Sequence, residues 1–129
     1  MGDYTHLNLR NDVEDQAAKH GMSPAVEARF ARDDLECEQV AVSYQRLAPG
    51  VRQPFGHRHR THEELYVVTG GGGRVKVDAD VTELKPLDVV RVAPGSVRAF
   101  EGGPEGIELL AFGPHGVTDA EVVPDWWTT

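Results

Sequence analysis

Short runs of valine, leucine, phenylalanine and tyrosine, separated by proline and glycine, constrain the fold of this 129-residue chain most. Such runs are typical of β-strands, because branched and aromatic side chains pack well on a pleated surface and Pro and Gly interrupt it. Many short strands without helices between them indicate an all-β antiparallel sandwich or barrel. We predict strands at residues 25–31, 38–47, 55–59, 64–69, 74–77, 81–84, 89–92, 97–101 and 107–112.

Turns and one short helix complete the predicted organisation. The run Gly70 to Gly73 is interpreted as a hairpin turn, because no Lys-Ser/Thr pair follows it as in a phosphate-binding loop. A second break is predicted at 102–104. Near the start, Asp12 is placed to cap a helix over 13–20 that ends at Gly21. We therefore divide the chain into an N-terminal arm with a short helix (1–24), a barrel (25–114) and a C-terminal tail (115–129) that packs on the domain or on a partner subunit.

Length and charge narrow the possible partners. The chain has the size of one domain, and its formal net charge of -8 disfavours binding to a phosphate backbone. Its first residues hold no apolar run of the length that an export signal or a membrane span needs. Cys37 is the only cysteine, so an internal disulfide is excluded. We expect a cytoplasmic protein with neither nucleic acid nor membrane as a partner.

Metal-type ligands gather in one segment, which runs His57-Arg-His59-Arg-Thr-His62-Glu63-Glu64. Side chains two residues apart on a strand share a face, so His57 and His59 can reach one ion. Imidazole with carboxylate suits a divalent transition metal such as Mn, Fe, Ni, Cu or Zn better than calcium. The alternative is a pair of histidines satisfied by ordinary hydrogen bonds.

The segment resembles the first sequence motif of the cupins. That motif has a His-x-His pair, a Glu separated from it by three or four residues, and a glycine separated from the Glu by six residues; His57, His59, Glu64 and Gly71 match it. Glu63 with Gly70 matches the shorter spacing equally well. Strand parity leaves the choice open, because both faces after the acid are apolar. We favour Glu64, since the doubled-Glu form resembles cupins whose second acid binds the metal.

Residues 87–100 resemble the second sequence motif of the cupins but depart from it at some positions. Where the family usually has a fourth metal-binding histidine, this chain has Arg98, and a guanidinium cannot coordinate a cation. Three placements of Arg98 stay open: an ordinary surface charge, an ion pair with Glu64 in a metal-free barrel, or a contact to a bound small acid. His62 is either a substitute ligand or a solvent-facing turn residue.

The resemblance implies a small single-domain cupin of unassigned function. It implies a jelly-roll barrel of two antiparallel sheets, a metal site inside the barrel, and a homodimer formed by sheet contacts. The expected ligands are His57, His59 and Glu64, and Arg98, Tyr66 and His62 are the candidate substrate contacts.

Three functions compete at the sequence level, and the catalytic residues are unknown. The first is a metal-dependent protein acting on or binding a small organic molecule; as an enzyme it would be a dioxygenase, isomerase or decarboxylase. The second is a metal-free binding protein with Arg98 as an anion anchor. The third, an epimerase with His59 as base and Tyr66 as acid, is weakest, because no carboxylate partner for the histidine can be identified.

Overall fold

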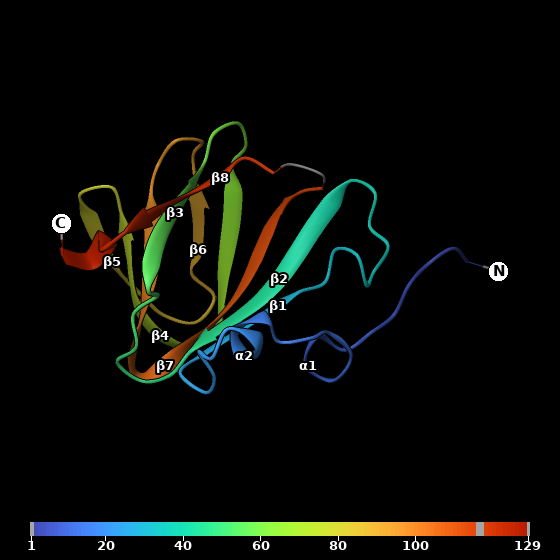
Figure 1. The fold of residues 1–129 in the computed structure, drawn as a ribbon, viewed down its shortest axis with the longest axis horizontal. Coiled ribbons are helices and arrows are strands. Elements are labelled where there is room, and N and C mark those ends of the chain that lie inside the picture. The colour runs from blue at the N-terminus through green and yellow to red at the C-terminus, as the bar shows by residue number, and fades with distance from the viewer. Residues whose placement is uncertain (1, 116–117, 129) are drawn as a thin grey trace.

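The chain folds into a curled antiparallel β-sheet, seen in a computed structural model that describes residues 2–115 and 118–128 (Figure 1). This confirms the all-β prediction. The strands are β1 (Val26–Phe30), β2 (Val40–Leu47), β3 (Phe55–His59), β4 (Glu64–Val77), β5 (Asp80–Leu84), β6 (Val89–Val92), β7 (Arg98–Pro114) and β8 (Ala120–Pro124).

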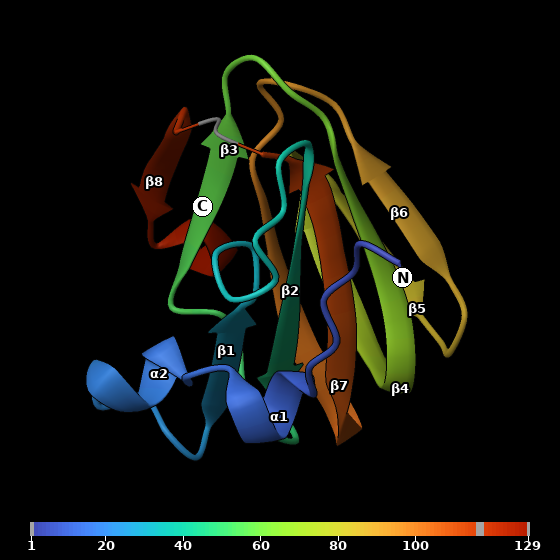
Figure 2. The same ribbon diagram turned by 90° about the vertical axis from the view of Figure 1, so that its right-hand side faces the viewer.

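Two long strands organise the sheet. β4 and β7 pair with each other along almost their whole lengths. The remaining strands pair with one or the other of them or extend the sheet beyond those partners. β2 and β1 extend the sheet beyond one half of β7, whereas β5 and β6 pair with β4. β3 meets β7 through the pair His57 and Arg98, and β8 forms the edge beyond β3. Figure 2 shows β3 and β8 facing the layer of β2, β7, β4 and β6 across the barrel.

The interior is formed by alternate residues of these strands, as the two-residue repeat of a strand requires. Tyr66 and Val68 of β4 are almost completely buried. Leu65, which precedes Tyr66 on the same strand, faces out and is 41% exposed. The connected core cluster consists of Leu47, Tyr66, Val68, Val75, Leu84, Val92, Phe100, Ile107, Leu109 and Ala111.

The helix predicted over 13–20 was given the wrong first residue and was predicted too long. Two one-turn helices occur instead, α1 (Leu9–Asp12) and α2 (Gln16–Lys19). Asn8 and Asp15 cap them with their side chains, so each helix has its own start signal and Val13 between them is extended. Among the described residues, no helix is long and apolar enough to cross a membrane.

Both predicted breaks at glycine clusters are also wrong, because the strands continue through them. Residues 70–73 lie within β4 and residues 102–104 lie within β7, where the two strands cross closely with shifts of register. A Cβ added to Gly71 would lie 2.1 Å from the Gly106 carbonyl oxygen, and one added to Gly73 would lie 1.9 Å from that of Glu101. The glycines therefore permit a close approach of two backbones rather than a turn.

One strand, β8, was not predicted from the sequence. Its residues pair with all of β3, and the 3-10 helix Trp126–Thr128 follows it. Trp126 packs against Gly56 of β3, where an added Cβ would lie 2.7 Å from the indole. The indole nitrogen donates to the carbonyl of Lys76 at 3.2 Å. These contacts place the C-terminal segment beside the strand that carries His57 and His59.

Candidate metal centre

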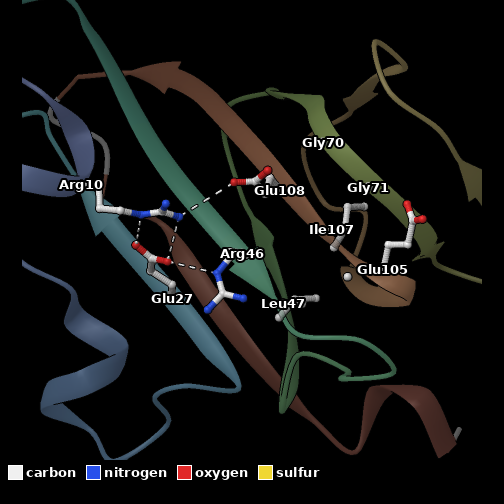
Figure 3. Close-up of a pocket in the computed structure, with 10 residues that line it drawn as sticks. Arg10, Glu27, Arg46, Leu47, Gly70, Gly71, Glu105, Ile107 and Glu108 are labelled. Atoms are coloured by element: carbon white, nitrogen blue, oxygen red, sulfur yellow. Dashed lines mark hydrogen bonds and ion pairs between the residues drawn. The ribbon is translucent and has the colours of Figure 1, made fainter.

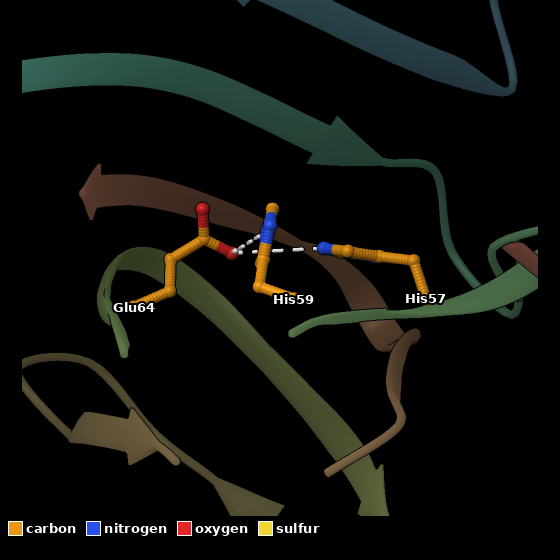
Figure 4. Close-up of side chains that lie close together, drawn as sticks. All are labelled: His57, His59 and Glu64. Atoms are coloured by element: carbon orange, nitrogen blue, oxygen red, sulfur yellow. Dashed lines mark ion pairs between the residues drawn. The ribbon is translucent and has the colours of Figure 1, made fainter. Parts of the chain in front are cut away.

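β3 presents His57 and His59 toward the same point, as their two-residue spacing predicts. The Nε2 atoms of the two imidazoles lie 3.6 and 3.5 Å from Oε1 of Glu64, the first residue of β4 (Figure 4). One ligand atom from each of the three residues lies within 4.8 Å of the others. The fold thus brings the three residues expected as ligands together.

The structure separates the two glutamates that strand parity left open. The carboxylate of Glu64 lies among the histidines, and its side chain is 17% exposed. Glu63 points to the other face, where it pairs with Arg91 of the neighbouring strand at 3.2 Å and is largely exposed. Glu64 is therefore the acid available to an ion at this point.

Arg98 is completely buried, so its interpretation as a surface charge is wrong. It is the β7 residue paired with His57, and its side chain turns inward. Its Nη2 donates to Oε1 of Glu64 at 3.0 Å, and its Nη1 donates to the Ser96 carbonyl at 3.1 Å. The charge cannot be left unpaired in the interior, and Glu64 neutralises it.

Tyr66 connects Arg98 and Glu64. Its hydroxyl accepts a hydrogen bond from Nε of Arg98 at 2.9 Å and donates one to Oε1 of Glu64. Burial and the Glu64 carboxylate raise the pKa of Tyr66, which keeps its proton. Burial would raise the pKa of Glu64 as well, but the hydrogen bonds of His57 and Tyr66 and the charge of Arg98 outweigh it and lower that pKa to about 2. Glu64 is therefore an anion at neutral pH.

Asp119, just before β8, is a site residue that the sequence analysis missed. Its Oδ1 lies 3.0 Å from Nδ1 of His59 and 3.3 Å from Nδ1 of His62. Its Oδ2 accepts from the backbone N and from Oγ1 of Thr61, at 2.6 and 2.7 Å. Burial opposes ionisation of Asp119, but the bonds from Thr61 and His59 hold its pKa well below the usual range. The β-branched pair Val122-Val123, followed by Pro124, was the available signal for a strand here.

His62 lies on the loop between β3 and β4, away from solvent, so its interpretation as a solvent-facing residue is wrong. Its ring lies 4.1 Å from that of His59, centre to centre. His59, His62 and Asp119 form a second group of three potential ligands that shares His59 with the first.

The first group fits a divalent transition metal. His59 Nε2 is buried and has no hydrogen-bond partner among the described residues, although it faces the Glu64 carboxylate. Two imidazoles and one carboxylate are the ligand types that such metals prefer. Arg98 acts against binding, because it already holds the Glu64 oxygen that faces both histidines.

A separate hollow of about 410 Å³ is open elsewhere on the molecule (Figure 3). Charged residues line it, among them Arg10, Glu27, Arg46 and Glu108. Glu27 binds Arg10 and Arg46 there, so these charges are paired with one another. Neither histidine of the first group lines this hollow.

Comparison with known proteins gives the fold a name. No protein-family model matches the sequence, and neither does any curated protein. Among solved structures, a cupin protein from Bacteroides fragilis superposes with a TM-score of 0.71 at 24% identity, over 90% of this chain and 88% of that one. The fold is that of a cupin.

Two larger proteins contain the same cupin fold. Oxalate decarboxylase from Bacillus subtilis superposes with a TM-score of 0.71 at 18% identity, over 90% of this chain and 31% of that one. Salicylate 1,2-dioxygenase from Pseudoaminobacter salicylatoxidans gives 0.68 at 13% identity, over 84% of this chain and 32% of that one. This chain spans about a third of either enzyme, so these matches concern the fold alone.

Proposed function

We propose that this protein binds a divalent transition metal, one of Mn, Fe, Ni, Cu or Zn, through His57, His59 and Glu64. One observation carries the proposal: His59 Nε2 and the Glu64 carboxylate, which lie 3.5 Å apart, face each other with no donor between them. A cation between two such acceptors relieves their repulsion and satisfies a buried polar atom. A metal held there supplies a Lewis acid and open coordination positions for a substrate.

The substrate class that we propose is a small organic molecule, with an acid as the favoured type. The buried positive charge of Arg98 beside the ligands supports an anionic substrate, although each of its nitrogens already has a protein acceptor. Cupins named for oxalate and for salicylate also support small acids as the class. Tyr66 and His62 stand beside the ligands as further contacts.

Metal analysis of the untagged protein tests the proposal. We expect near-stoichiometric transition metal in the wild type and its loss in a His57→Ala, His59→Ala double variant. A His6→Ala, His20→Ala variant is the matched control, because both of those histidines are exposed and lie outside the centre. Equal metal contents in the three proteins would refute the proposal.

A second candidate is metal-free binding of a small acid. The ion pair between Arg98 and Glu64 favours it, since it gives the interior a balanced charge without any metal. An acid that displaced Glu64 from Arg98 would raise the melting temperature in the presence of a chelator, and the Arg98→Gln variant would lose this shift. A shift that requires added metal would support the first candidate instead.

We further propose that the protein is a cytoplasmic homodimer without a nucleic-acid or membrane partner. The outer face of the sheet supports self-association, because apolar side chains lie next to one another across its strands. Leu65 pairs with Phe112, and Val67 pairs with both Leu110 and Val89. Leu65, Phe112 and Val89 are 41%, 39% and 60% exposed, which makes a continuous apolar surface available to a second copy.

A further inference from the structure

Asp119 lies outside both cupin-like motifs, yet its carboxylate contacts Thr61, His59 and His62 at the candidate centre. It lies 60 residues after His59 and is 7% exposed. Two donors from Thr61 fix its Oδ2, so its Oδ1 is left facing the rings of His59 and His62. Because Thr61 holds Oδ2, the carboxylate cannot rotate freely, and Oδ1 stays directed at the two histidine rings.

The contact between Asp119 and His59 indicates which ring nitrogen of His59 carries the proton. An ionised carboxylate only accepts hydrogen bonds, so Nδ1 of His59, at 3.0 Å, must be the protonated nitrogen. In a neutral imidazole Nε2 then carries a lone pair, and this is the nitrogen that faces Glu64. Carboxylates that orient metal-binding imidazoles in this way are common in metal sites.

We propose that Asp119 is a positioning residue that fixes the Nδ1–H tautomer of His59 and so presents its Nε2 lone pair toward Glu64. For its effect on a metal, the inference rests on the proposed function. The tautomer itself depends only on contacts within the chain, so it can be tested in metal-free protein.

The Asp119→Asn variant tests this tautomer sharply. The backbone N–H of Thr61 requires an acceptor, so the amide oxygen of the variant turns toward Thr61. The amide nitrogen then faces Nδ1 of His59 as a donor. His59 must accept at Nδ1 and move its proton to Nε2, which removes the lone pair from the side that faces Glu64.

Long-range ¹⁵N–¹H correlation spectra of the histidine rings in metal-free protein provide the first readout. We expect His59 as the Nδ1–H tautomer in the wild type and as the Nε2–H tautomer in Asp119→Asn. The second readout is the Zn²⁺ affinity from competition with a chromophoric chelator, which we expect to fall roughly 10- to 100-fold in the variant. Glu121→Gln is the matched control, because its carboxylate lies two residues further along and pairs with Arg58 at 3.5 Å.

Two results would overturn the inference: a wild-type His59 that carries its proton on Nε2 or on both nitrogens, or an Asp119→Asn variant that binds Zn²⁺ within twofold of the wild type. If the wild type shows the expected tautomer and takes up no metal, the proposed function fails and the role of Asp119 stands. The wild-type spectrum decides the question even if Asp119→Asn does not fold. Thr61→Val, which removes one of the two donors to Oδ2, should then keep the tautomer and weaken Zn²⁺ binding less.

Discussion

Arg98 brings a buried positive charge into the candidate metal centre, in contact with Glu64. It occupies the position where the cupin resemblance places a fourth histidine ligand, and its Nη2 lies 3.0 Å from Glu64. A guanidinium is a fixed positive charge in proteins. Any metal ion must therefore share the Glu64 carboxylate with a fixed cation.

We predict that Arg98→His increases the affinity for Mn²⁺. Removing a unit positive charge about 5 Å from a divalent ion relieves a repulsion of roughly 7 kcal/mol at an effective dielectric constant of about 20, and the imidazole adds a ligand. Isothermal titration calorimetry measures the change. Arg98→Gln, which removes the charge without adding a ligand, should lie between wild type and Arg98→His; an unchanged affinity in both would show that Arg98 does not oppose the metal.

The residues of the centre were predictable only in part. The spacing of His57 and His59 on one strand face follows from the strand repeat, whereas the same repeat could not separate Glu63 from Glu64. Arg98 was identified as a departure from the motif, but its burial depends on Tyr66 and Glu64 from another strand. Asp119 reaches His59 only through the pairing of β8 with β3, which no local pattern shows.

At the scale of single elements, the charge cluster on β1 links α1 to the sheet. Glu27 of β1 is nearly buried and binds Arg46 of β2 at 3.1 Å and Arg10 of α1 at 3.3 Å (Figure 3). It also binds Arg29 of its own strand at 2.7 Å. Burial would raise the pKa of Glu27, but the hydrogen bonds from the three arginines lower it to about 2. The folded state therefore holds this carboxylate ionised more strongly than the unfolded chain does.

This cluster predicts a loss of stability in acid. Because the folded pKa of Glu27 is about 2 and its ordinary value is 4.5, its contribution is complete above pH 4.5 and is lost as the pH falls toward 2. Glu27→Gln should lower the unfolding free energy at pH 7 by about 2 to 3 kcal/mol and flatten its decline below pH 4.5. Urea unfolding at several pH values measures both; Glu14→Gln, an exposed carboxylate, is the control, and parallel pH curves for Glu27→Gln and wild type would contradict the prediction.

The glycine clusters of β4 and β7 predict a second effect at this scale. Gly71→Ala should destabilise the fold by at least about 2 kcal/mol, because its Cβ would collide with the Gly106 carbonyl and its φ is +63°. Gly50→Ala is the matched control, since Gly50 has a φ of +74° but no atom within 4 Å of the added Cβ. Thermal unfolding of both variants separates the close contact from the backbone conformation, and equal losses would show that the contact does not matter.

These glycines also explain which elements the sequence could predict. Apolar alternation located most of the strands, because each strand buries one face in the same core. The two breaks predicted at 70–73 and 102–104 were wrong, since a glycine that allows two backbones to cross looks the same in sequence as a glycine in a turn. Gly73 and Gly102 differ from turn glycines only through carbonyls that approach from other parts of the chain.

At the scale of the whole molecule, the apolar outer face predicts self-association. Phe112 lies between Val42 and Leu65, its partners on the two neighbouring strands, and the three residues form an apolar row. Phe112→Lys places a charge at the centre of this row and should convert a dimer to a monomer without unfolding the protein. Sedimentation equilibrium measures the mass. Val122→Lys is the control, because Val122 is 60% exposed on β8, away from this row. A monomeric wild type, or a dimeric Phe112→Lys, would contradict the proposed interface.

The long sequence separation between His59 and Asp119 has a consequence for protein synthesis. At about 5 to 20 residues per second, the ribosome adds the 60 residues between them in roughly 3 to 12 seconds. During that interval a nascent chain carries both β3 imidazoles and Glu64 but not the carboxylate that selects the ring tautomer. An ion bound at that stage would meet imidazoles whose tautomers Asp119 has not yet fixed. The complete centre that we propose can form only after residue 119 has been synthesised.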